Sequence, residues 1–432
     1  MKKSHFILIA IIATAFSCTG EMSNTANIAS YNIHETNSNK RSYDEALLAA
    51  NNALHNLYNG FTRSDGNKPT ELLPEVKYVV DKPLVTRSTG VSVDTLMYVF
   101  NIENEQGFII ISANKNTPPL LAYTDAGYYD PAEEQDNIGF QQLIEGTKQY
   151  VKKSVNNTGI VYTSKGPIFI GEVTYLILQQ VGKFINVSWG QEDPEGLYCP
   201  NGASGCVITA MAMLMSYYNS PSSISITHDG LSIPNYSLNW TQMKYHKRRH
   251  SYSSQNEHFL TQQDSINCHE MISHLCRQLG CISGSDYSNY NTLTNNDSIS
   301  TTFAQCGYYC SDYIPYTQAD LKSILDQGRP VFMLGYTSGN QGHAWLVDGY
   351  QYCDVYDPNV MTMNPDGSIT FGAHYYRYYN HINWGWDGKN NGYFIANSFY
   401  TLGERYDYTG NNNYNYNFIN NLEMLNVFPS NN

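Results

Sequence analysis

The chain has little charge and, after its N-terminal region, no apolar segment long enough to span a membrane. Asp, Glu, Lys and Arg make up only 15% of the 432 residues, whereas 41% are hydrophobic. A disordered chain has the opposite balance, so the composition predicts an ordered globular protein with a largely neutral polar surface. Because no later segment reaches about 18 consecutive apolar residues, we expect no membrane-spanning helix there.

Positive charge is also scarce. The chain has 25 Lys and Arg against 38 Asp and Glu, which gives a formal net charge of −13. Its one basic cluster, Lys244 to Arg249, is expected to be a solvated loop or helix face. Proteins bind nucleic acid through basic surfaces, so nucleic acid is not an expected partner.

Motifs for metal ions and disulfides are incomplete. Of the nine cysteines, an odd number remains once a lipidated and a catalytic cysteine are set aside, so no specific disulfide is predicted. His269 and His274 are five positions apart, not at the i, i+4 spacing with which two histidines on one helix bind zinc. Cys306 and Cys310 lack the second pair of a structural zinc site. We therefore expect neither a metal nor a cofactor.

The first 18 residues have the pattern of a signal peptide. Two lysines are followed by an apolar run over residues 6–16, which is too short to remain as a membrane span, and by Cys18. Cys18 stands where a lipoprotein signal has its lipidated cysteine. We expect an exported protein, anchored at the outer surface or in the periplasm through a lipid on Cys18, or freely secreted after ordinary cleavage near this point.

Residues 19–41 are rich in Asn, Ser and Thr and are typical of a flexible tether. Ser42 and Glu45 then form a capping box, and apolar residues at helical spacing predict a helix over 42–59. A hairpin is expected from 96–102 and 108–112, and a second helix over 137–155. These elements predict a compact α+β unit that ends in an exposed polar stretch, where a maturation cut near Lys165 is expected.

Cys206 follows a glycine turn and begins a helical run. The N–H groups and the dipole at a helix N-terminus lower the pKa of a thiol, and Gly205 leaves room for a substrate carbonyl. This context is typical of a nucleophile. Taken alone, a buried structural cysteine is the alternative interpretation.

His343 lies between a glycine and a short apolar strand, where its imidazole can face a cleft and take the thiol proton. Asn383 and Trp384 come later in the chain. The Asn383 carbonyl is expected to accept from the imidazole N–H, and the Trp384 indole to shield that bond from water. The order Cys, His, Asn is that of papain-like proteases.

Gln191 is the fourth candidate. Its side-chain N–H and the backbone N–H of Cys206 could form the oxyanion hole that binds the tetrahedral intermediate. An ordinary surface glutamine is the alternative interpretation of this residue.

From about Pro167 to Pro429 the chain resembles the streptopain family of papain-fold cysteine peptidases. The motifs that carry the resemblance are Trp189-Gly-Gln191, Tyr198-Cys-Pro200, Gly205-Cys-Val207, Leu325–Val331, Gly342-His-Ala344, Asp348-Gly-Tyr350 and Asn383-Trp-Gly-Trp386. The resemblance implies a catalytic dyad of Cys206 and His343, supported by Asn383 and Trp384. Met213, where relatives commonly have Gln, and Asp387, within a Trp-Gly-Gly pattern, depart from the family.

The N-terminal region is similar to the inhibitory propeptide of the same family. The similar segments are Tyr98–Asn101, Gly107–Ala113 and Pro118–Tyr123. The expected fold class is therefore α+β, with a small α+β propeptide before a papain-like domain that has a helical lobe and an antiparallel β lobe. The expected division is signal peptide 1–18, tether 19–41, inhibitory propeptide 42–165 and peptidase domain 166–432.

The sequence thus predicts an exported cysteine endopeptidase made as a zymogen, with protein or peptide substrates and with its own propeptide as an intramolecular inhibitor. Hydrolysis would proceed through an acyl-thioester on Cys206, with His343 as the base for the attack by water. Two alternatives keep the same fold. One is an amide transferase that uses the same dyad, and the other is a non-catalytic surface binding protein.

Overall fold

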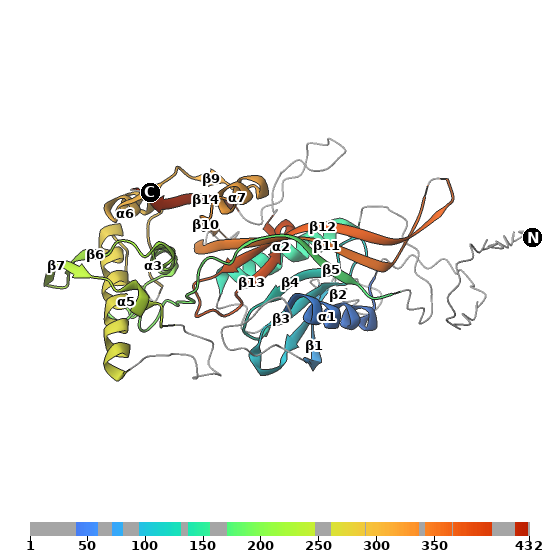
Figure 1. The fold of residues 1–432 in the computed structure, drawn as a ribbon, viewed down its shortest axis with the longest axis horizontal. Helices are drawn as coiled ribbons and strands as arrows, with labels where there is room; N and C mark the ends of the chain where they lie inside the picture. Colours follow the sequence, from blue (N-terminus) through green and yellow to red (C-terminus); the bar gives the residue numbers. More distant parts are fainter. Residues whose placement is uncertain are drawn as a thin grey trace, which may run out of the picture. The chain divides into compact units, whose positions relative to one another are not determined.

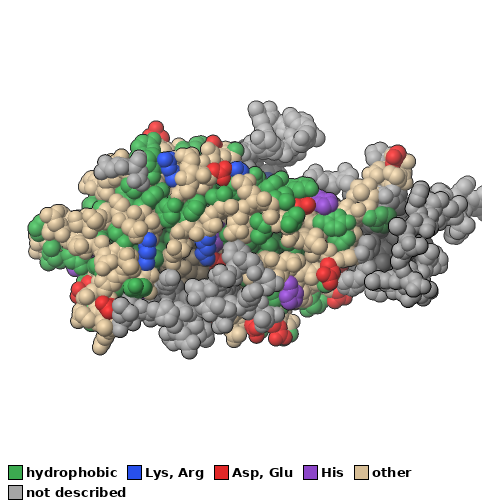
Figure 2. All heavy atoms as spheres, in the orientation of Figure 1, with side chains coloured by type: hydrophobic (Ala, Val, Ile, Leu, Met, Phe, Trp, Pro, Cys, Tyr) green, Lys and Arg blue, Asp and Glu red, His purple; other side chains and the backbone are tan. Residues whose placement is uncertain are grey.

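A computed structural model of the chain describes residues 40–58, 71–80, 95–130, 137–155, 171–246, 261–289, 291–336, 342–364, 366–399 and 420–430. The expected signal peptide, Cys18, most of the tether and Lys165 lie outside these residues. No helix in the described ranges is both long and apolar enough to cross a membrane. On the face drawn in Figure 2, the Lys and Arg side chains of the described residues are scattered and form no continuous basic surface.

The N-terminal part contains the two expected helices and the expected hairpin, together with two strands, β1 (Leu72–Val80) and β4 (Leu120–Thr124), that were not predicted. The helices are α1 (Tyr43–Tyr58) and α2 (Ile138–Val155), and the hairpin strands are β2 (Thr95–Ile102) and β3 (Phe108–Ser112). The predicted capping box is present, because the Ser42 N–H donates to Glu45 Oε2 at 2.7 Å and the Glu45 N–H donates to Ser42 Oγ at 3.3 Å. The predicted hairpin is confirmed as the antiparallel pair β2–β3.

The rest of the chain combines helices with a large antiparallel sheet, so the predicted α+β class is confirmed. The helices are α3 (Cys206–Tyr218), α4 (Trp240–Met243), α5 (Gln262–Ser283), α6 (Asp297–Gln305) and α7 (Gln318–Leu325). The strands are β5 (Thr174–Gly182), β6 (Ser223–His228), β7 (Leu231–Ser237), β8 (Tyr308–Cys310), β9 (Ile314–Pro315), β10 (Val331–Tyr336), β11 (Gly342–Met363), β12 (Ile369–Asn383), β13 (Gly392–Ile395) and β14 (Asn420–Pro429).

One sheet runs through both parts of the chain, in the order β1-β2-β3-β4-β13-β12-β11-β10-β14-β8. Its N-terminal and C-terminal halves join where β4 pairs antiparallel with β13, and Thr124 lies opposite Gly392 in that pair. A Cβ atom on Gly392 would lie 2.4 Å from the Thr124 Cα, so this close backbone approach requires glycine. Figure 1 shows the resulting sheet with α1 and α2 beside it and with α3 and α5 farther along the molecule.

Strand β11 separates two hydrophobic cores. Its side chains alternate between the faces of the sheet, so Trp345 and Val347 pack with the N-terminal elements, while Ala344 and Leu346 pack with α3 and α5. The first core therefore contains side chains from both the N-terminal unit and the C-terminal sheet. His343, which precedes this alternation, lies on the same face as Trp345, toward the N-terminal elements.

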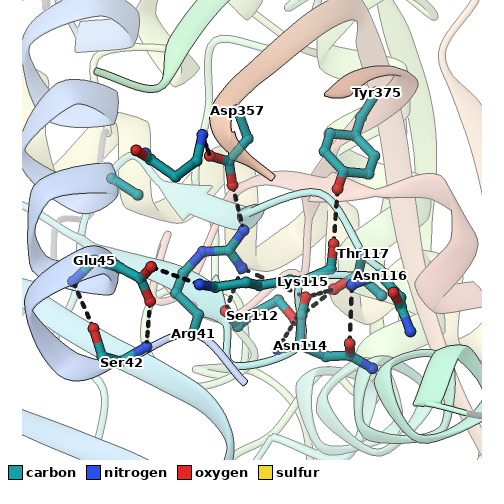
Figure 3. Close-up of polar contacts among 12 residues, drawn as sticks. Arg41, Ser42, Glu45, Ser112, Asn114, Lys115, Asn116, Thr117, Asp357 and Tyr375 are labelled. Carbon is teal, nitrogen blue, oxygen red and sulfur yellow. Dashed lines mark hydrogen bonds and ion pairs between the residues drawn. The ribbon is translucent and has the colours of Figure 1, made fainter. Parts of the chain in front are cut away.

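A buried ion pair joins Arg41 to the far end of β11 (Figure 3), so the last residue of the expected flexible tether 19–41 is fixed against the sheet. Arg41 Nη2 lies 2.6 Å from Asp357 Oδ2, and the two side chains are 2% and 3% exposed. Arg41 Nη1 also donates to the carbonyl of Ser112 at 3.1 Å. On β12, the Tyr375 hydroxyl donates to the carbonyl of Lys115 at 2.8 Å. Charge and hydrogen bonding thus add to the shared sheet and core in holding the two units together.

Candidate active site

Cys206 is the first residue of α3, as predicted. Gly205 before it has φ +86°, and a Cβ atom there would lie 3.0 Å from Thr292 Cβ, so both conformation and space favour glycine. Backbone N–H groups of Val207 and of Cys206 itself point to the thiol, as does that of Ala344 on β11. The Ala344 contact brings the start of the helix against the strand that carries His343.

His343 is 5% exposed and lies among tryptophans. Its ring stacks on Trp345 at a centroid distance of 6.0 Å and meets Trp386 edge-on at 6.4 Å. Its Nε2 lies 3.1 Å from the backbone carbonyl of Trp384, which can only accept, so Nε2 carries the proton. In a neutral imidazole, this tautomer leaves Nδ1 as the proton acceptor that a general base needs.

The structure corrects the expected role of Asn383. Its Oδ1 accepts from the Gly385 N–H at 3.3 Å and its Nδ2 donates to the Val187 carbonyl at 2.8 Å, so the imidazole N–H goes to Trp384 instead. The physical reason is the turn after β12, where Gly385 has φ +68° and the Trp384 carbonyl lies against the ring. Asn383 fixes this turn and connects it to the segment that leads to Gln191.

Gln191 lies at the end of a segment that is bonded along its length. Its backbone carbonyl accepts from the Ser204 N–H at 2.7 Å, and the Gly190 carbonyl accepts from Thr209 Oγ1 at 2.9 Å. The side-chain Nε2 is buried and has no hydrogen-bond partner among the described residues. A buried donor with unused hydrogen-bonding capacity is what an oxyanion hole requires before substrate arrives.

The N-terminal end of α2 covers His343. A Cβ atom on Gly139 would lie 2.5 Å from His343 Cδ2 and 2.8 Å from Trp384 Cε3, so the helix backbone touches both rings. Phe140 meets Trp384 edge-on at 6.4 Å, and Gln142 is buried beside Gly335, the residue opposite His343 on β10. Sequence reasoning missed this contact. The sequence feature that could have indicated it is Gly139, a glycine in the first turn of an otherwise regular helix, where glycine is unfavourable.

Burial changes the expected charge state of the dyad. Burial raises the pKa of the Cys206 thiol, although the N–H groups of Ala344 and Val207 act in the opposite direction. Burial likewise lowers the pKa of His343 to about 4, against the effect of its bond to Trp384. The expected thiolate–imidazolium pair is therefore disfavoured in this covered state, because low-dielectric surroundings disfavour both charged forms.

The two departures from the family pattern have local explanations. Asp387 has φ +53°, a left-handed conformation that glycine adopts freely and that Asp tolerates. Its carboxylate lies against the backbone of Gly190, 2.3 Å from the position of a Cβ there. Met213 is fully buried, and its Cε lies 3.4 Å from the Cβ position of Gly385. Neither residue contacts the thiol or the imidazole in any described interaction.

In the described part of the chain, His269 and His274 do not face a common ligand. His269 packs against His246 at 4.9 Å between ring centroids, whereas His274 bonds to His228 at 3.3 Å, so the two face different partners. Within the described ranges, no three His, Cys, Asp or Glu side chains are arranged to hold a metal ion. The eight described cysteines are all free thiols.

Comparison with known proteins gives two domain matches. Residues 189–394 match the Peptidase C10 family, and residues 32–151 match the Spi protease inhibitor. Streptopain from Streptococcus pyogenes serotype M1 is 23% identical over 331 residues, which cover 69% of this chain and 73% of that protein. The thiol protease/hemagglutinin PrtT of Porphyromonas gingivalis is 21% identical over 337 residues, which cover 70% of this chain and 34% of that protein. A fragment of Prevotella intermedia prointerpain A is a structural neighbour with 18% identity and a TM-score of 0.46, covering 81% of this chain and 98% of the fragment.

Proposed function

We propose that Cys206 and His343 are the catalytic dyad of this chain. The premise is that the chain carries a Peptidase C10 domain and a Spi protease inhibitor domain and is a cysteine peptidase. The observation that carries the proposal is the contact between the Cys206 thiol and the backbone N–H of Ala344, the residue after His343. This contact brings a helix N-terminus to the strand of a histidine whose Nδ1 is the free acceptor.

In the open enzyme, His343 Nδ1 takes the proton of the Cys206 thiol, and the thiolate attacks the carbonyl carbon of the scissile peptide bond. The imidazolium then gives its proton to the leaving amine, and an acyl-thioester remains on Cys206. Water, deprotonated by His343, hydrolyses the thioester and restores the thiol. The Trp384 carbonyl keeps the imidazole in the required tautomer throughout, because it accepts the Nε2 proton.

The negative charge of each tetrahedral intermediate is stabilised by two donors, Gln191 Nε2 and the Cys206 backbone N–H. The buried, unpartnered state of Gln191 Nε2 supports this role. Asn383 contributes indirectly, since its carboxamide joins the turn of Trp384 to Val187 on the segment that leads to Gln191. Asn383 is thus a positioning residue for both the imidazole and the oxyanion hole.

The chain is a zymogen, and we attribute its latency to α2, whose Gly139 lies against His343. The propeptide would span 42–165 and the peptidase domain 166–432, with the activating cut near Lys165. The signal peptide over 1–18 would direct export, followed by anchoring through a lipid on Cys18 or by free secretion. An amide transferase and a non-catalytic binding protein remain the two alternatives with this fold.

The test uses the processed protein under reducing conditions with an unfolded protein as substrate. Cys206→Ala should abolish cleavage, while Cys281→Ala, which removes a half-buried thiol from α5, should leave it unchanged. Cleavage by the Cys206→Ala protein at the wild-type rate would refute the assignment. Incorporation of an added amine in place of hydrolysis would identify the transferase, and N-terminal sequencing of the processed form would locate the cut.

A further inference from the structure

A carboxylate of the propeptide enters a charged site on the peptidase domain, away from the dyad. Asp125 directly follows β4, and its Oδ2 lies 3.0 Å from Nε2 of His381 on β12 and also pairs with Lys183. We propose that Lys183 and His381 form a carboxylate-binding site that receives Asp125 and holds the precursor closed. The proposal rests on the proposed function, since closure is what keeps Cys206 from its substrates.

A buried carboxylate of the peptidase domain, Asp348, holds His381 in position for this site. His381 is 1% exposed, and its Nδ1 lies 2.5 Å from Oδ1 of Asp348, which is fully buried on β11. The second Asp348 oxygen accepts from the Ile185 N–H at 2.8 Å. Both oxygens of Asp348 are therefore occupied, and His381 is held with Nε2 directed at Asp125. The Asp348-Gly-Tyr350 motif, which has no place in the catalytic dyad, acquires a role as the support of this site.

Charge balance explains why the ligand is a carboxylate. Burial alone would lower the pKa of His381, but Asp348 and Asp125 raise it, so the charged imidazolium is favoured. Lys183 and a charged His381 carry two positive charges, whereas Asp348 carries one negative charge. The carboxylate of Asp125 brings the net charge of the cluster to zero. Burial alone would raise the pKa of Asp125, yet Lys183 and His381 hold it far below its ordinary range.

The position of Asp125 connects this site to latency. Its backbone N–H donates to the Asn391 carbonyl at 2.8 Å, one residue beyond the pair of Thr124 with Gly392. Asn391 Oδ1 in turn accepts from the backbone N–H of Trp384, the residue whose carbonyl holds the catalytic imidazole. Asp125 therefore fixes the edge of the propeptide sheet at the same turn that α2 covers.

Closure should depend on pH through His381. The groups facing it are Asp348 from β11, Asp125 and Lys183 from the two domains, and the ring of Tyr393 on β13 at 4.9 Å. Because Asp125 raises the pKa of His381, closing the precursor favours its protonation. This contribution is complete below the pKa of His381 in the open state and is lost as the pH rises through the pKa in the closed state.

The experiment measures how fast a peptide-based thiol-reactive inhibitor labels Cys206 in the uncut, full-length precursor. Asp125→Asn should speed labelling about 10- to 100-fold, as expected for a lost hydrogen bond between charged groups. Asp44→Asn, the same change at an exposed propeptide position, should have no effect. His381→Gln should remove the part of the alkaline increase in precursor labelling that the processed enzyme does not show, since ionisation of the Cys206 thiol raises labelling in both forms.

Lys183→Gln keeps the test decisive if the Asp125 variant folds poorly, because Lys183 is partly exposed and thermal unfolding of the variant can be checked. It should speed labelling in the same direction by a smaller factor. Labelling of folded Asp125→Asn and Lys183→Gln precursors at the Asp44→Asn rate would overturn the proposal. Processed wild-type protein is the control for the proposed function. If it is not labelled at Cys206, the dyad assignment fails, whereas normal labelling with unchanged precursors refutes only the carboxylate site.

Discussion

Gly139→Ala should affect the stability of the closed precursor in two opposite ways, through helix propensity and through crowding of His343. Whether the substitution stabilises or destabilises the precursor therefore shows which effect is larger. In an ordinary helix the change stabilises by about 0.5–1 kcal/mol, because glycine has the larger conformational freedom to lose. Here the new methyl group would lie 2.5 Å from His343 Cδ2, and the ring cannot simply turn away, since it is bonded to the Trp384 carbonyl and stacked on Trp345. Overpacking of this kind costs about 1–3 kcal/mol.

We therefore expect Gly139→Ala to weaken closure by about 1–2 kcal/mol and to speed inhibitor labelling of Cys206 in the precursor about 5- to 30-fold. Residue 139 lies within the predicted propeptide, so the processed enzyme should be as active as the wild type, which provides an internal control. Thermal unfolding of the precursor measures the same loss independently. Slower labelling together with a higher Tm would refute the contact, because only the helix propensity would then be acting.

Three further outcomes follow from the structure. Arg41→Met should destabilise the precursor by about 3–5 kcal/mol in denaturant unfolding, because it leaves the buried Asp357 carboxylate without its cation. Lys77→Met breaks an exposed ion pair and should change the free energy of unfolding by about 1 kcal/mol or less. Equal effects of the two substitutions would contradict the role given to burial. Gln191→Ala should lower kcat of the processed enzyme about 100-fold with little change in KM, as the loss of an oxyanion donor does, and a change in KM alone would argue for substrate contact only. Acidification should remove the contribution of neutral His343 to closure. The closed state lowers the pKa of His343 to about 4, so this contribution is complete above the ordinary value of 6.5 and is lost as the pH falls from 6.5 toward 4, opposite in sign to the contribution of His381. Labelling of the precursor relative to the processed enzyme measures this, and a ratio that stays constant over that range would contradict it.

The sequence was sufficient for elements whose signals are local. The capping box at Ser42, the β2–β3 hairpin and the start of α3 at Cys206 all follow from residues a few positions apart, and the structure confirms them. Such patterns depend only on neighbours along one element.

The remaining features depend on atoms that a sequence does not mark. The partner of His343 is a backbone carbonyl, which every residue possesses, so nothing distinguished Trp384 from Asn383 as the source. Asp125 and His381 are 256 positions apart, and no sequence pattern around either residue predicts their contact. The neutral dyad could not be foreseen either, because it results from burial by α2, a helix from the other end of the chain.

The pairing of β4 with β13 covers a strand edge of the C-terminal sheet that maturation would expose. Once the propeptide is lost, the backbone N–H and C=O groups of β13 that faced β4 have no strand beside them. Tyr393 and Phe394, now almost fully buried, flank that opening. Strand edges of this kind recruit other strands and lead to self-association unless they are covered. The N-terminal segment therefore also covers a strand edge of the C-terminal sheet, and we expect its removal to expose an edge at which two copies of the domain can pair.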